Sequence, residues 1–240
     1  GVSLGMNLLP TDGKLCSFNC IYCECGLNEN HRTRSKLPTR AEVKEALIHK
    51  LSSMQAEGVA PDVITFAGNG EPTMHPEFAG IIDDTIETRN RFFPKAKIAV
   101  LSNSTMLYKE DVFQALNKIE DNILKLDSIS DSRIGQLNVP NSPAFTFDRL
   151  LEQLCRFNGN LIIQTMFLKG EVNGESVTNT TEHEISGWLE ALKQIKPKQV
   201  MIYTIDRETP VKNLKKVTKD ELEAIADRAR QEGFEVMVSA

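Results

Sequence analysis

The segment KLCSFNCIYCECG, residues 14–26, contains four of the five cysteines in a chain of 240 residues. Cys16, Cys20 and Cys23 follow the spacing Cys-x3-Cys-x2-Cys, and Cys25 comes two residues later. The residues between them are mostly poor helix formers, and proline or glycine lies on each side. We therefore expect a loop in which the thiols serve as metal ligands.

Two other uses of these cysteines remain open at this point. On a helix, positions i, i+4 and i+7 would share one face, and the sulfurs would be buried core. A zinc ion would need four ligands, and Cys25 or His31 would supply the fourth. An iron–sulfur cluster held by three thiolates, in contrast, leaves one iron without a protein ligand, where a substrate or cofactor binds.

The overall composition excludes several classes of protein. Hydrophobic residues make up 40% of the chain and charged residues 25%, as in ordinary globular proteins. The net charge of -5 lacks the basic excess of nucleic-acid binders. No apolar run is long enough to cross a bilayer, and the chain begins without a signal-peptide pattern. An odd, clustered set of cysteines is untypical of secreted disulfide scaffolds. We therefore expect a cytoplasmic protein without a membrane partner.

Strand-like and helix-like segments alternate along the chain. The expected strands are 2–9, 62–68, 97–103, 122–127, 161–168, 199–205 and 234–239. The expected helices are 39–58, 75–93, 109–119, 146–157, 181–195 and 218–233. Thr39 and Glu42 have the spacing of a capping box, and Pro76 is expected in the first turn of the second helix. The alternation predicts an α/β fold, one domain over 1–240, with six βα units and a final strand. A barrel and an open doubly wound sheet both fit.

Ligands of parallel α/β folds bind at the carboxyl ends of the strands, so polar residues there are candidates. The turn AGNGEP, residues 67–72, follows the second strand, and its glycines permit close backbone approach. Ser102 and Asn103 follow the third strand and suit ribose or adenine, although such residues also form ordinary turns. Lys125 lies in an apolar strand and must reach solvent, meet an anion or pair with Asp127. Gln164 is polar within the fifth strand.

The cysteine spacing, with Tyr22 just before the third cysteine, resembles the signature of the radical S-adenosylmethionine (SAM) superfamily. The stretch Gly68-Asn69-Gly70-Glu71-Pro72 is similar to the Gly-Gly-Glu type motif of that family. Together with KLD (125–127) and IYTIDRETP (202–210), these motifs resemble the short, stand-alone enzymes that are similar to wyosine-synthesis enzymes. The resemblance covers residues 2–210.

The resemblance implies a partial TIM-type barrel with a [4Fe–4S] cluster on Cys16, Cys20 and Cys23. It implies that SAM binds the open iron and is cleaved to a 5′-deoxyadenosyl radical, which abstracts hydrogen from a substrate. An external electron donor of the flavodoxin or ferredoxin type is implied as a partner. The residues expected to contact SAM are Tyr22, Gly68, Asn69, Gly70, Glu71, Ser102, Asn103, Lys125, Asp127 and Gln164.

The substrate is less constrained. The related branch acts on modified nucleosides, either on transfer RNA or as free bases. A polyanion would need phosphate contacts, and although HRTRSK (31–36) is basic, the net charge and the single tryptophan favour a small substrate. A modified purine-like base is expected, with a queuine lyase as one specific form. The expected contacts are Asn7, Asn138, Tyr203, Asp206 and Arg207.

Several alternatives stay open. Asp206 and Arg207 are alternatively a structural pair. The reaction class is lyase, or else oxidoreductase or transferase. Competing functions are modification of transfer RNA, activation of a partner protein by a glycyl radical, and a zinc- or cluster-binding protein without catalysis.

Overall fold

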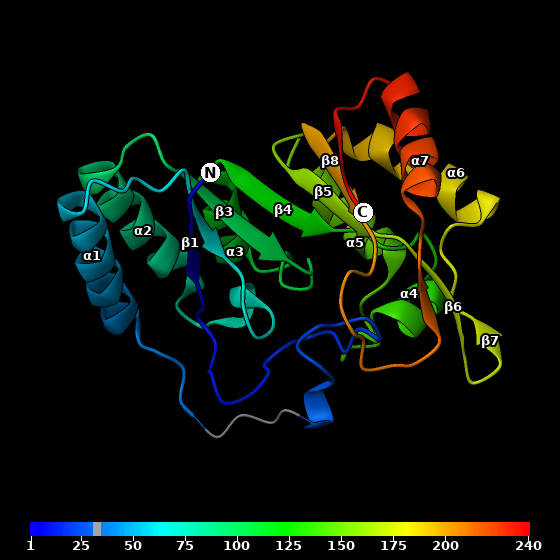
Figure 1. Cartoon of the computed structure of the whole chain (residues 1–240), viewed down its shortest axis with the longest axis horizontal. Coiled ribbons are helices and arrows are strands. Elements are labelled where there is room, and N and C mark those ends of the chain that lie inside the picture. Colours follow the sequence, from blue (N-terminus) through cyan, green and yellow to red (C-terminus); the bar gives the residue numbers. More distant parts are fainter. Residues whose placement is uncertain (31–34) are drawn as a thin grey trace. The chain divides into compact units, whose positions relative to one another are not determined.

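The computed structural model describes residues 1–30 and 35–240 (Figure 1). Within these residues the chain forms two compact units. The first comprises the described residues of Gly1–Cys16, His31–Ser102 and Met106–Asn122. The second comprises Ser17–Asn30, Asn103–Thr105 and Ile123–Ala240. The cysteine segment therefore contributes Cys16 to the first unit and its other cysteines to the second.

The first unit is built on parallel strands in the order β1-β2-β3. The strands are β1 (Ser3–Met6), β2 (Val63–Phe66) and β3 (Lys97–Ser102). Its helices are α1 (Arg40–Ala56), the 3-10 helix η2 (Pro72–Met74), α2 (Phe78–Phe92) and α3 (Glu110–Asn117). Alternate residues of β2, Ile64 and Phe66, are fully buried, and they lie in register with Ile98 and Val100 of β3. These apolar rows form the core of the unit.

The second unit is built on parallel strands in the order β4-β5-β8-β10. The strands are β4 (Asp121–Lys125), β5 (Ile162–Met166), β8 (Gln199–Tyr203) and β10 (Val236–Ser239). A separate antiparallel sheet has the order β7-β6-β9, with β6 (Leu168–Val172), β7 (Glu175–Ser176) and β9 (Leu214–Lys216). The helices are η1 (Asn28–Asn30), α4 (Asp131–Leu137), α5 (Phe147–Cys155), α6 (Glu182–Ile195) and α7 (Lys219–Gln231).

The predicted α/β architecture is confirmed, since each of the seven expected parallel strands and six expected helices is present. Two features differ from the expectation. The run 161–168 is not one strand, because β5 ends at Met166 and a new antiparallel strand begins at Leu168. Pro76 does not start α2, which begins at Phe78. A different proline, Pro72, takes the first position of η2.

Helix α4 and the small antiparallel sheet were not predicted. Helix α4 is seven residues long and mostly polar, and the strands of the small sheet are two to five residues long. Segments this short show too little periodicity to be recognised. None of the helices within residues 1–30 and 35–240 has the length and apolar character needed to span a bilayer.

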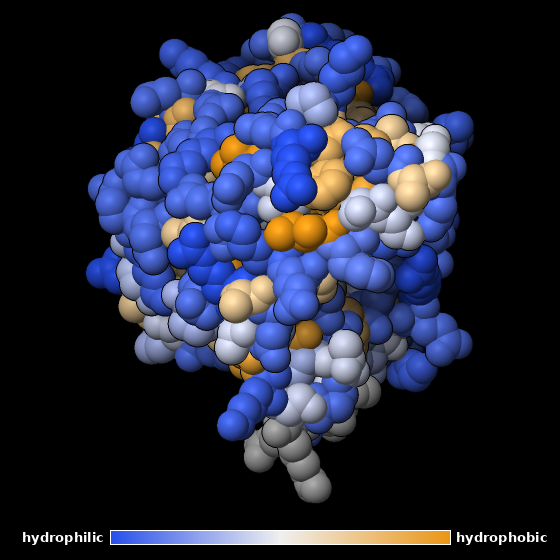
Figure 2. Space-filling model, turned by 90° about the vertical axis from the view of Figure 1, so that its left-hand side faces the viewer, coloured by the Kyte–Doolittle hydropathy of each residue, from blue (hydrophilic) through white to orange (hydrophobic). Residues whose placement is uncertain are grey.

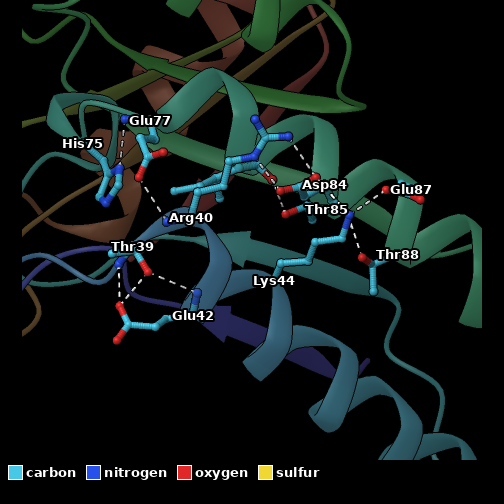
Figure 3. A network of polar contacts seen from close by, with 11 residues as sticks. Thr39, Arg40, Glu42, Lys44, His75, Glu77, Asp84, Thr85, Glu87 and Thr88 are labelled. Atoms are coloured by element: carbon cyan, nitrogen blue, oxygen red, sulfur yellow. Dashed lines mark hydrogen bonds and ion pairs between the residues drawn. The ribbon is translucent and has the colours of Figure 1, made fainter.

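Helices α1 and α2 are joined by a polar network (Figure 3). Arg40 of α1 forms a two-pronged ion pair with Asp84 of α2, with Nε–Oδ2 at 2.6 Å and Nη2–Oδ1 at 3.0 Å. Lys44 joins Asp84 at 3.2 Å and Glu87 at 2.9 Å. The hydrogen bonds from Arg40 hold the pKa of Asp84 below its usual range, against the opposing effect of burial. Figure 2 shows the side of the molecule that carries these helices, which is largely hydrophilic with scattered apolar side chains.

The same network reaches the segment after the glycine-rich turn. Glu77 accepts a hydrogen bond from the backbone N–H of Arg40 at 3.1 Å (Figure 3). His75, which is buried, has its Nε2 2.8 Å from the carbonyl oxygen of Pro38, and its Nδ1 accepts from Glu77 N. Both ring nitrogens are thus used in holding the chain, and His75 acts as a capping residue at the end of η2.

The predicted capping box of α1 is present. Thr39 Oγ1 accepts from Glu42 N at 3.3 Å, and Glu42 Oε2 accepts from Thr39 N at 2.7 Å. We expect Thr39→Ala to lower the free energy of unfolding by about 1 kcal/mol, because it leaves helix N–H groups without an acceptor. Urea denaturation measures this. Ser52→Ala, at an exposed position inside the same helix, should be neutral or slightly stabilising. Equal effects of the two substitutions would contradict a capping role for Thr39.

Candidate functional site

The glycine-rich turn of the first unit pairs with the residue just before Cys16. Leu15 N donates to Asn69 O at 2.9 Å, and Glu71 N donates to Leu15 O at 3.0 Å. A Cβ atom at Gly70 would lie 1.8 Å from the Leu15 carbonyl oxygen. We expected the glycines to admit a ligand. At Gly70 the close approach is made by the backbone of the cysteine segment itself.

A second glycine in this turn faces Asn7. Gly68 has φ +145°, and a Cβ there would lie 2.3 Å from Asn7 Oδ1. The Asn7 amide donates to Leu9 O at 3.0 Å and accepts from Leu9 N at 3.1 Å, as in an Asx turn. Asn69 donates from Nδ2 to Pro10 O at 3.2 Å. Side chains expected to contact substrate or SAM therefore fold the chain between β1 and the first cysteine.

Glu71 is buried directly after the glycines, with 1% of its surface exposed. Its Oε1 accepts from Thr73 N at 3.0 Å and from Thr73 Oγ1 at 2.5 Å. The carboxylate thereby caps η2. Glu71 thus has a local structural role beside the ammonium-binding role that the family resemblance implies.

In the second unit, the turn after β3 is hydrogen-bonded to the start of the cysteine loop. Asn103 Nδ2 donates to Ser17 Oγ at 3.0 Å, and Ser17 Oγ lies 2.5 Å from Thr105 Oγ1. Asn103 Oδ1 in turn accepts from Thr105 N at 3.1 Å. Ser102, the other residue expected at the adenosine, is buried at the end of β3 in the first unit. The sequence revealed no contact between Ser17 and Asn103, which lie 86 residues apart.

The carboxyl end of β4 bears a buried group of side chains that we call the β4 polar cluster: Tyr22, Lys125, Asp127, Asn138 and Tyr203. The Asp127 carboxylate at its centre is fully buried. Its Oδ2 accepts from Tyr22 OH and from Asn138 Nδ2, the latter at 2.7 Å, and its Oδ1 accepts from Met166 N at 2.9 Å. Three donors to one carboxylate compensate for its removal from water.

Lys125 supplies the positive charge of this cluster. Its Nζ lies 3.5 Å from Asp127 Oδ2 and donates to Tyr203 OH at 3.0 Å. The ammonium also sits over the rings of Tyr22 and Tyr203, 5.4 Å and 5.5 Å from their centroids. Burial alone would lower the pKa of Lys125, but the Asp127 charge and the nearby phenol outweigh it and raise that pKa. The pair between Lys125 and Asp127, one of the expected alternatives, is therefore present.

Cys20 borders the β4 polar cluster. Its Sγ lies 3.6 Å from Asn138 Nδ2. Burial raises the pKa of Cys20 to about 11, although the charge of Lys125 and the hydrogen bond from Asn138 both act to lower it. The thiol therefore keeps its proton until a metal displaces it, and the cation and the amide donor favour the thiolate form that a metal requires.

All five cysteines are thiols, and the cysteine loop has no helix between Cys16 and Cys25. The alternative of a helical face of buried sulfurs is therefore wrong. In the second unit, Cys23 N donates to Cys20 O at 3.1 Å within one turn. Three thiols at this spacing, one of them beside a cation and an amide donor, fit an iron–sulfur cluster by donor chemistry.

A second question is whether the described residues could bind a single metal ion, such as zinc. In the part of the chain that the structure describes, no group of three or more His, Cys, Asp or Glu side chains is placed to hold a metal ion. Zinc draws its sulfurs to within roughly 4 Å of one another, whereas each thiolate of an iron–sulfur cluster binds a different iron. His31, the other ligand considered for zinc, lies outside the described residues, as does most of the basic segment 31–36.

The remaining predicted residues lie apart from the β4 polar cluster or at its edge. Gln164 of β5 is beside Lys125 in register and is half-buried. Asp206 and Arg207 are exposed and form different ion pairs, so they are not paired with each other. Arg207 Nη1 meets Oε2 of Glu24, next to Cys23, at 2.9 Å, and Asp206 lies 4.0 Å from Lys216.

Two structural residues of this region were not identified from the sequence. Asn179, fully buried, donates from Nδ2 to the carbonyl oxygens of Asp127 and Met166 at 2.8 Å and 2.7 Å. Glu184, also buried, accepts from Ser128 Oγ at 2.8 Å. Asn179 lies in a polar stretch without periodicity, and Glu184 has the ordinary position of an acidic residue in the first turn of a helix. Neither position signals a contact with the β4 strand end.

We expect Lys125→Met to lower the free energy of unfolding by about 1–3 kcal/mol, since Asp127 keeps three donors but loses its cation. The pKa of Lys125 is raised by folding, so its contribution is complete below the ordinary lysine pKa, about 10.4, and decreases only above that value. Chemical denaturation of both proteins should therefore give the same difference at about pH 6 and pH 9. A difference that vanishes between these values would contradict the assignment.

Comparison with solved structures identifies the fold. The chain is similar over its full length to SuiB of Streptococcus suis, solved with S-adenosylmethionine, with TM-score 0.69, 14% identity and 50% of that chain covered. It is similar over 99% of its length to anSMEcpe with bound AdoMet, with TM-score 0.63, 15% identity and 64% of that chain covered. For TYW1 with a lysine–pyruvate adduct, the TM-score is 0.59 at 15% identity, over 96% of this chain and 70% of that one.

These similarities show the fold, which is the partial α/β barrel of the radical SAM enzymes, as predicted. They decide between the two architectures that the alternation of strands and helices left open. The similarity to TYW1 is no greater than that to SuiB, so the fold does not single out the wyosine-synthesis-like branch.

No family model matches the chain. Among curated proteins, the GTPase Obg of Brachyspira hyodysenteriae is 27% identical over 93% of this chain. The match covers only 31% of the length of that relative. The UPF0026 protein of Methanocaldococcus jannaschii is 27% identical over 90% of this chain and 63% of its own length. The UPF0026 protein of Helicobacter pylori is 31% identical over 92% of this chain and 68% of its own length. On this last similarity, the chain belongs to the UPF0026 family.

Proposed function

We propose that this protein is a radical SAM enzyme in which Cys16, Cys20 and Cys23 hold a [4Fe–4S] cluster. One observation carries the proposal. The three cysteines follow β1 of a fold shared with SuiB and anSMEcpe, both of which were solved with SAM bound. The cluster, when bound, supplies the electron that cleaves SAM to a 5′-deoxyadenosyl radical, and a flavodoxin- or ferredoxin-type carrier delivers that electron.

The protein's own residues place and tune the ligands. Asn69 and Glu71 hold Leu15, at the start of the cysteine loop, by backbone hydrogen bonds. Lys125 keeps a proton on Nζ and puts positive charge next to the Cys20 thiolate that a metal would bind. From the family resemblance, we propose that the backbone of 68–71 and the side chain of Gln164 are among the contacts of SAM.

For the substrate we propose a small molecule, with a modified purine-like base as the leading candidate and lyase chemistry as one reaction class. Two observations favour a small substrate. The net charge of -5 disfavours a polyanion, and Arg207, an exposed cation, is paired with Glu24 rather than available to a phosphate. Tyr203 offers a half-buried phenol at the end of β8 for a polar group of the substrate.

Anaerobic reconstitution with iron and sulfide tests the proposal. We expect a brown protein with broad absorption near about 400 nm, which forms 5′-deoxyadenosine when dithionite and SAM are added. The variant with alanine at positions 16, 20 and 23 is the matched control and should form none. A colourless wild-type protein that retains one zinc ion would show that the proposed chemistry is wrong.

The substrate is tested separately. Each candidate substrate is labelled with deuterium. If the radical abstracts a labelled hydrogen, the deuterium appears in the 5′-deoxyadenosine that is formed. We expect transfer from a deuterated free purine-like base and none from deuterated transfer RNA. Transfer from transfer RNA alone would overturn the small-substrate proposal and leave the radical SAM assignment intact.

A further inference from the structure

We propose that Asn138 is a positioning residue whose amide donates a hydrogen bond to the Cys20 sulfur and thereby raises the reduction potential of the bound cluster. The inference rests on the proposed function, because it assigns a role toward that cluster. It replaces our expectation that Asn138 contacts the substrate. Asn138 is 2% exposed, and its amide faces the β4 polar cluster.

The Asn138 amide nitrogen has three acceptors around it. Asp127 Oδ2 lies at 2.7 Å, Tyr22 OH at 2.9 Å and Cys20 Sγ at 3.6 Å. An amide nitrogen has two hydrogens. The nearest acceptor, the carboxylate, takes one. The second is shared between sulfur and phenol, and a thiolate attracts it more strongly than a neutral phenol oxygen because the thiolate carries charge.

The backbone around Asn138 fixes this geometry. Asn138 ends α4, with its N–H donated to Ile134 O at 2.9 Å. Its own carbonyl oxygen accepts from Asn19 N at 2.9 Å, and the Leu137 carbonyl oxygen accepts from Ile21 N at 3.0 Å. The residues on both sides of Cys20 are therefore hydrogen-bonded to the end of α4. These backbone bonds fix the position of Asn138 beside Cys20, and the hydrogen bond from Nδ2 to Asp127 Oδ2 orients its amide.

The start of α4 is held as well. Ser130 Oγ caps the helix by accepting from Arg133 N at 3.4 Å. Glu184 of α6 accepts from Ser128 Oγ at 2.8 Å and from Ile129 N at 3.3 Å, immediately before the helix. Both ends of this short helix are thus tied to neighbouring elements of the second unit, and Asn138 is presented to Cys20 by a rigid support.

A donor at the ligand sulfur has a defined electrostatic effect. Reduction adds negative charge to an iron–sulfur cluster, and hydrogen bonds to its sulfurs stabilise that charge. The interaction is strong here because the site is buried. The opposing influence is the Asp127 carboxylate, whose Oδ2 is occupied by Tyr22 and Asn138. Asn138 therefore both supplies a donor to sulfur and covers the nearest negative group.

The test compares midpoint potentials of reconstituted proteins with equal iron content, by titration followed by electron paramagnetic resonance. We expect Asn138→Leu to lower the equilibrium constant for one-electron reduction about tenfold, a shift of about 59 mV to more negative potential. Asn138→Ala, which also removes the donor, should shift it in the same direction. Asn179→Ala is the control, since Asn179 supports the same strand end without reaching Cys20.

Three outcomes would overturn the inference. The potential of Asn138→Leu is unchanged; or Asn179→Ala shifts it equally, which would indicate a general effect of loosened packing; or Asn138→Ala shifts it to a more positive value. If Asn138→Leu retains no iron, the Asn138→Ala variant decides alone. A wild-type protein that forms no cluster would overturn the proposed function itself, whereas a cluster with an unshifted potential would overturn only the role of Asn138.

Discussion

Cys20→Ala, reconstituted beside the wild-type chain, is expected to lose most of its cluster iron and to form 5′-deoxyadenosine at a rate lower by more than about 100-fold, beyond what loss of an outer-shell partner costs. The thiolate is the ligand, and none of the other three loop thiols replaces it at the same place. Cys16→Ala and Cys23→Ala should behave alike. Iron and sulfide analysis, followed by chromatography of the nucleoside product, measures both effects.

Cys25→Ala and Cys155→Ala are the matched controls for this series. Cys25 lies in the same loop, and Cys155 lies at the end of α5. Both substitutions should leave iron content and nucleoside formation near the wild-type level. If Cys25→Ala were as damaging as Cys20→Ala, the ligand set would have to be revised, and full activity of Cys20→Ala would remove the basis of the proposed function.

Gly70→Ala is expected to be among the most destabilising substitutions in the chain, by about 3–5 kcal/mol. The strained backbone, with φ +141°, accounts for about 1–3 kcal/mol. A methyl group 1.8 Å from the Leu15 carbonyl oxygen must also break the two hydrogen bonds between Leu15 and the turn, each worth about 1 kcal/mol. The two nearest atoms belong to the backbone of Leu15, which cannot move aside as the end of a side chain can. Chemical denaturation gives the free energy directly.

Gly5→Ala in β1 provides the comparison, because no atom lies within 4 Å of the added methyl group. It should be close to neutral, and a similar loss at both positions would mean that the effect of Gly70→Ala is not due to its contact with Leu15. A folded Gly70→Ala protein should also reconstitute poorly, since the displaced Leu15 directly precedes Cys16.

The strands of the main sheets were predictable because each is an apolar run bounded by polar turns. The prediction did not require knowing which strands pair with one another. The end of β5 shows what such a local pattern does not predict. Residues 161–168 form one largely apolar run, and nothing local indicates that Met166 ends one strand and Leu168 starts another. The change of direction depends on pairing with distant residues, such as the bond from Phe167 N to Tyr203 O at 2.8 Å.

The candidate site shows the same limit more sharply. The cysteine spacing and the cost of burying Lys125 are local signals, and the structure places Cys20 and Lys125 at the same group of polar side chains. Asn138, in contrast, lies 118 residues from Cys20 and meets it only because α4 ends beside the cysteine loop. The sequence offered Asn138 only as a candidate substrate contact. Its burial and its contact with Cys20 are decided by tertiary packing.

The glycine-rich turn was expected to admit a ligand, and the structure shows a second reason for its glycines. Gly70 does need an open backbone, but the approach that requires it is made by Leu15, 55 residues earlier in the chain. A ligand and a neighbouring backbone segment place the same demand on a glycine. Sequence alone does not distinguish them.

The central claim is that one iron of the cluster lacks a protein ligand and binds SAM. Electron paramagnetic resonance of the dithionite-reduced protein, with and without SAM, tests it most directly. We expect that SAM changes the signal of the reduced cluster and that SAM labelled with 15N at its amino group gives a resolved coupling to the cluster. An identical spectrum with and without SAM, in a protein that holds a complete cluster, would contradict it.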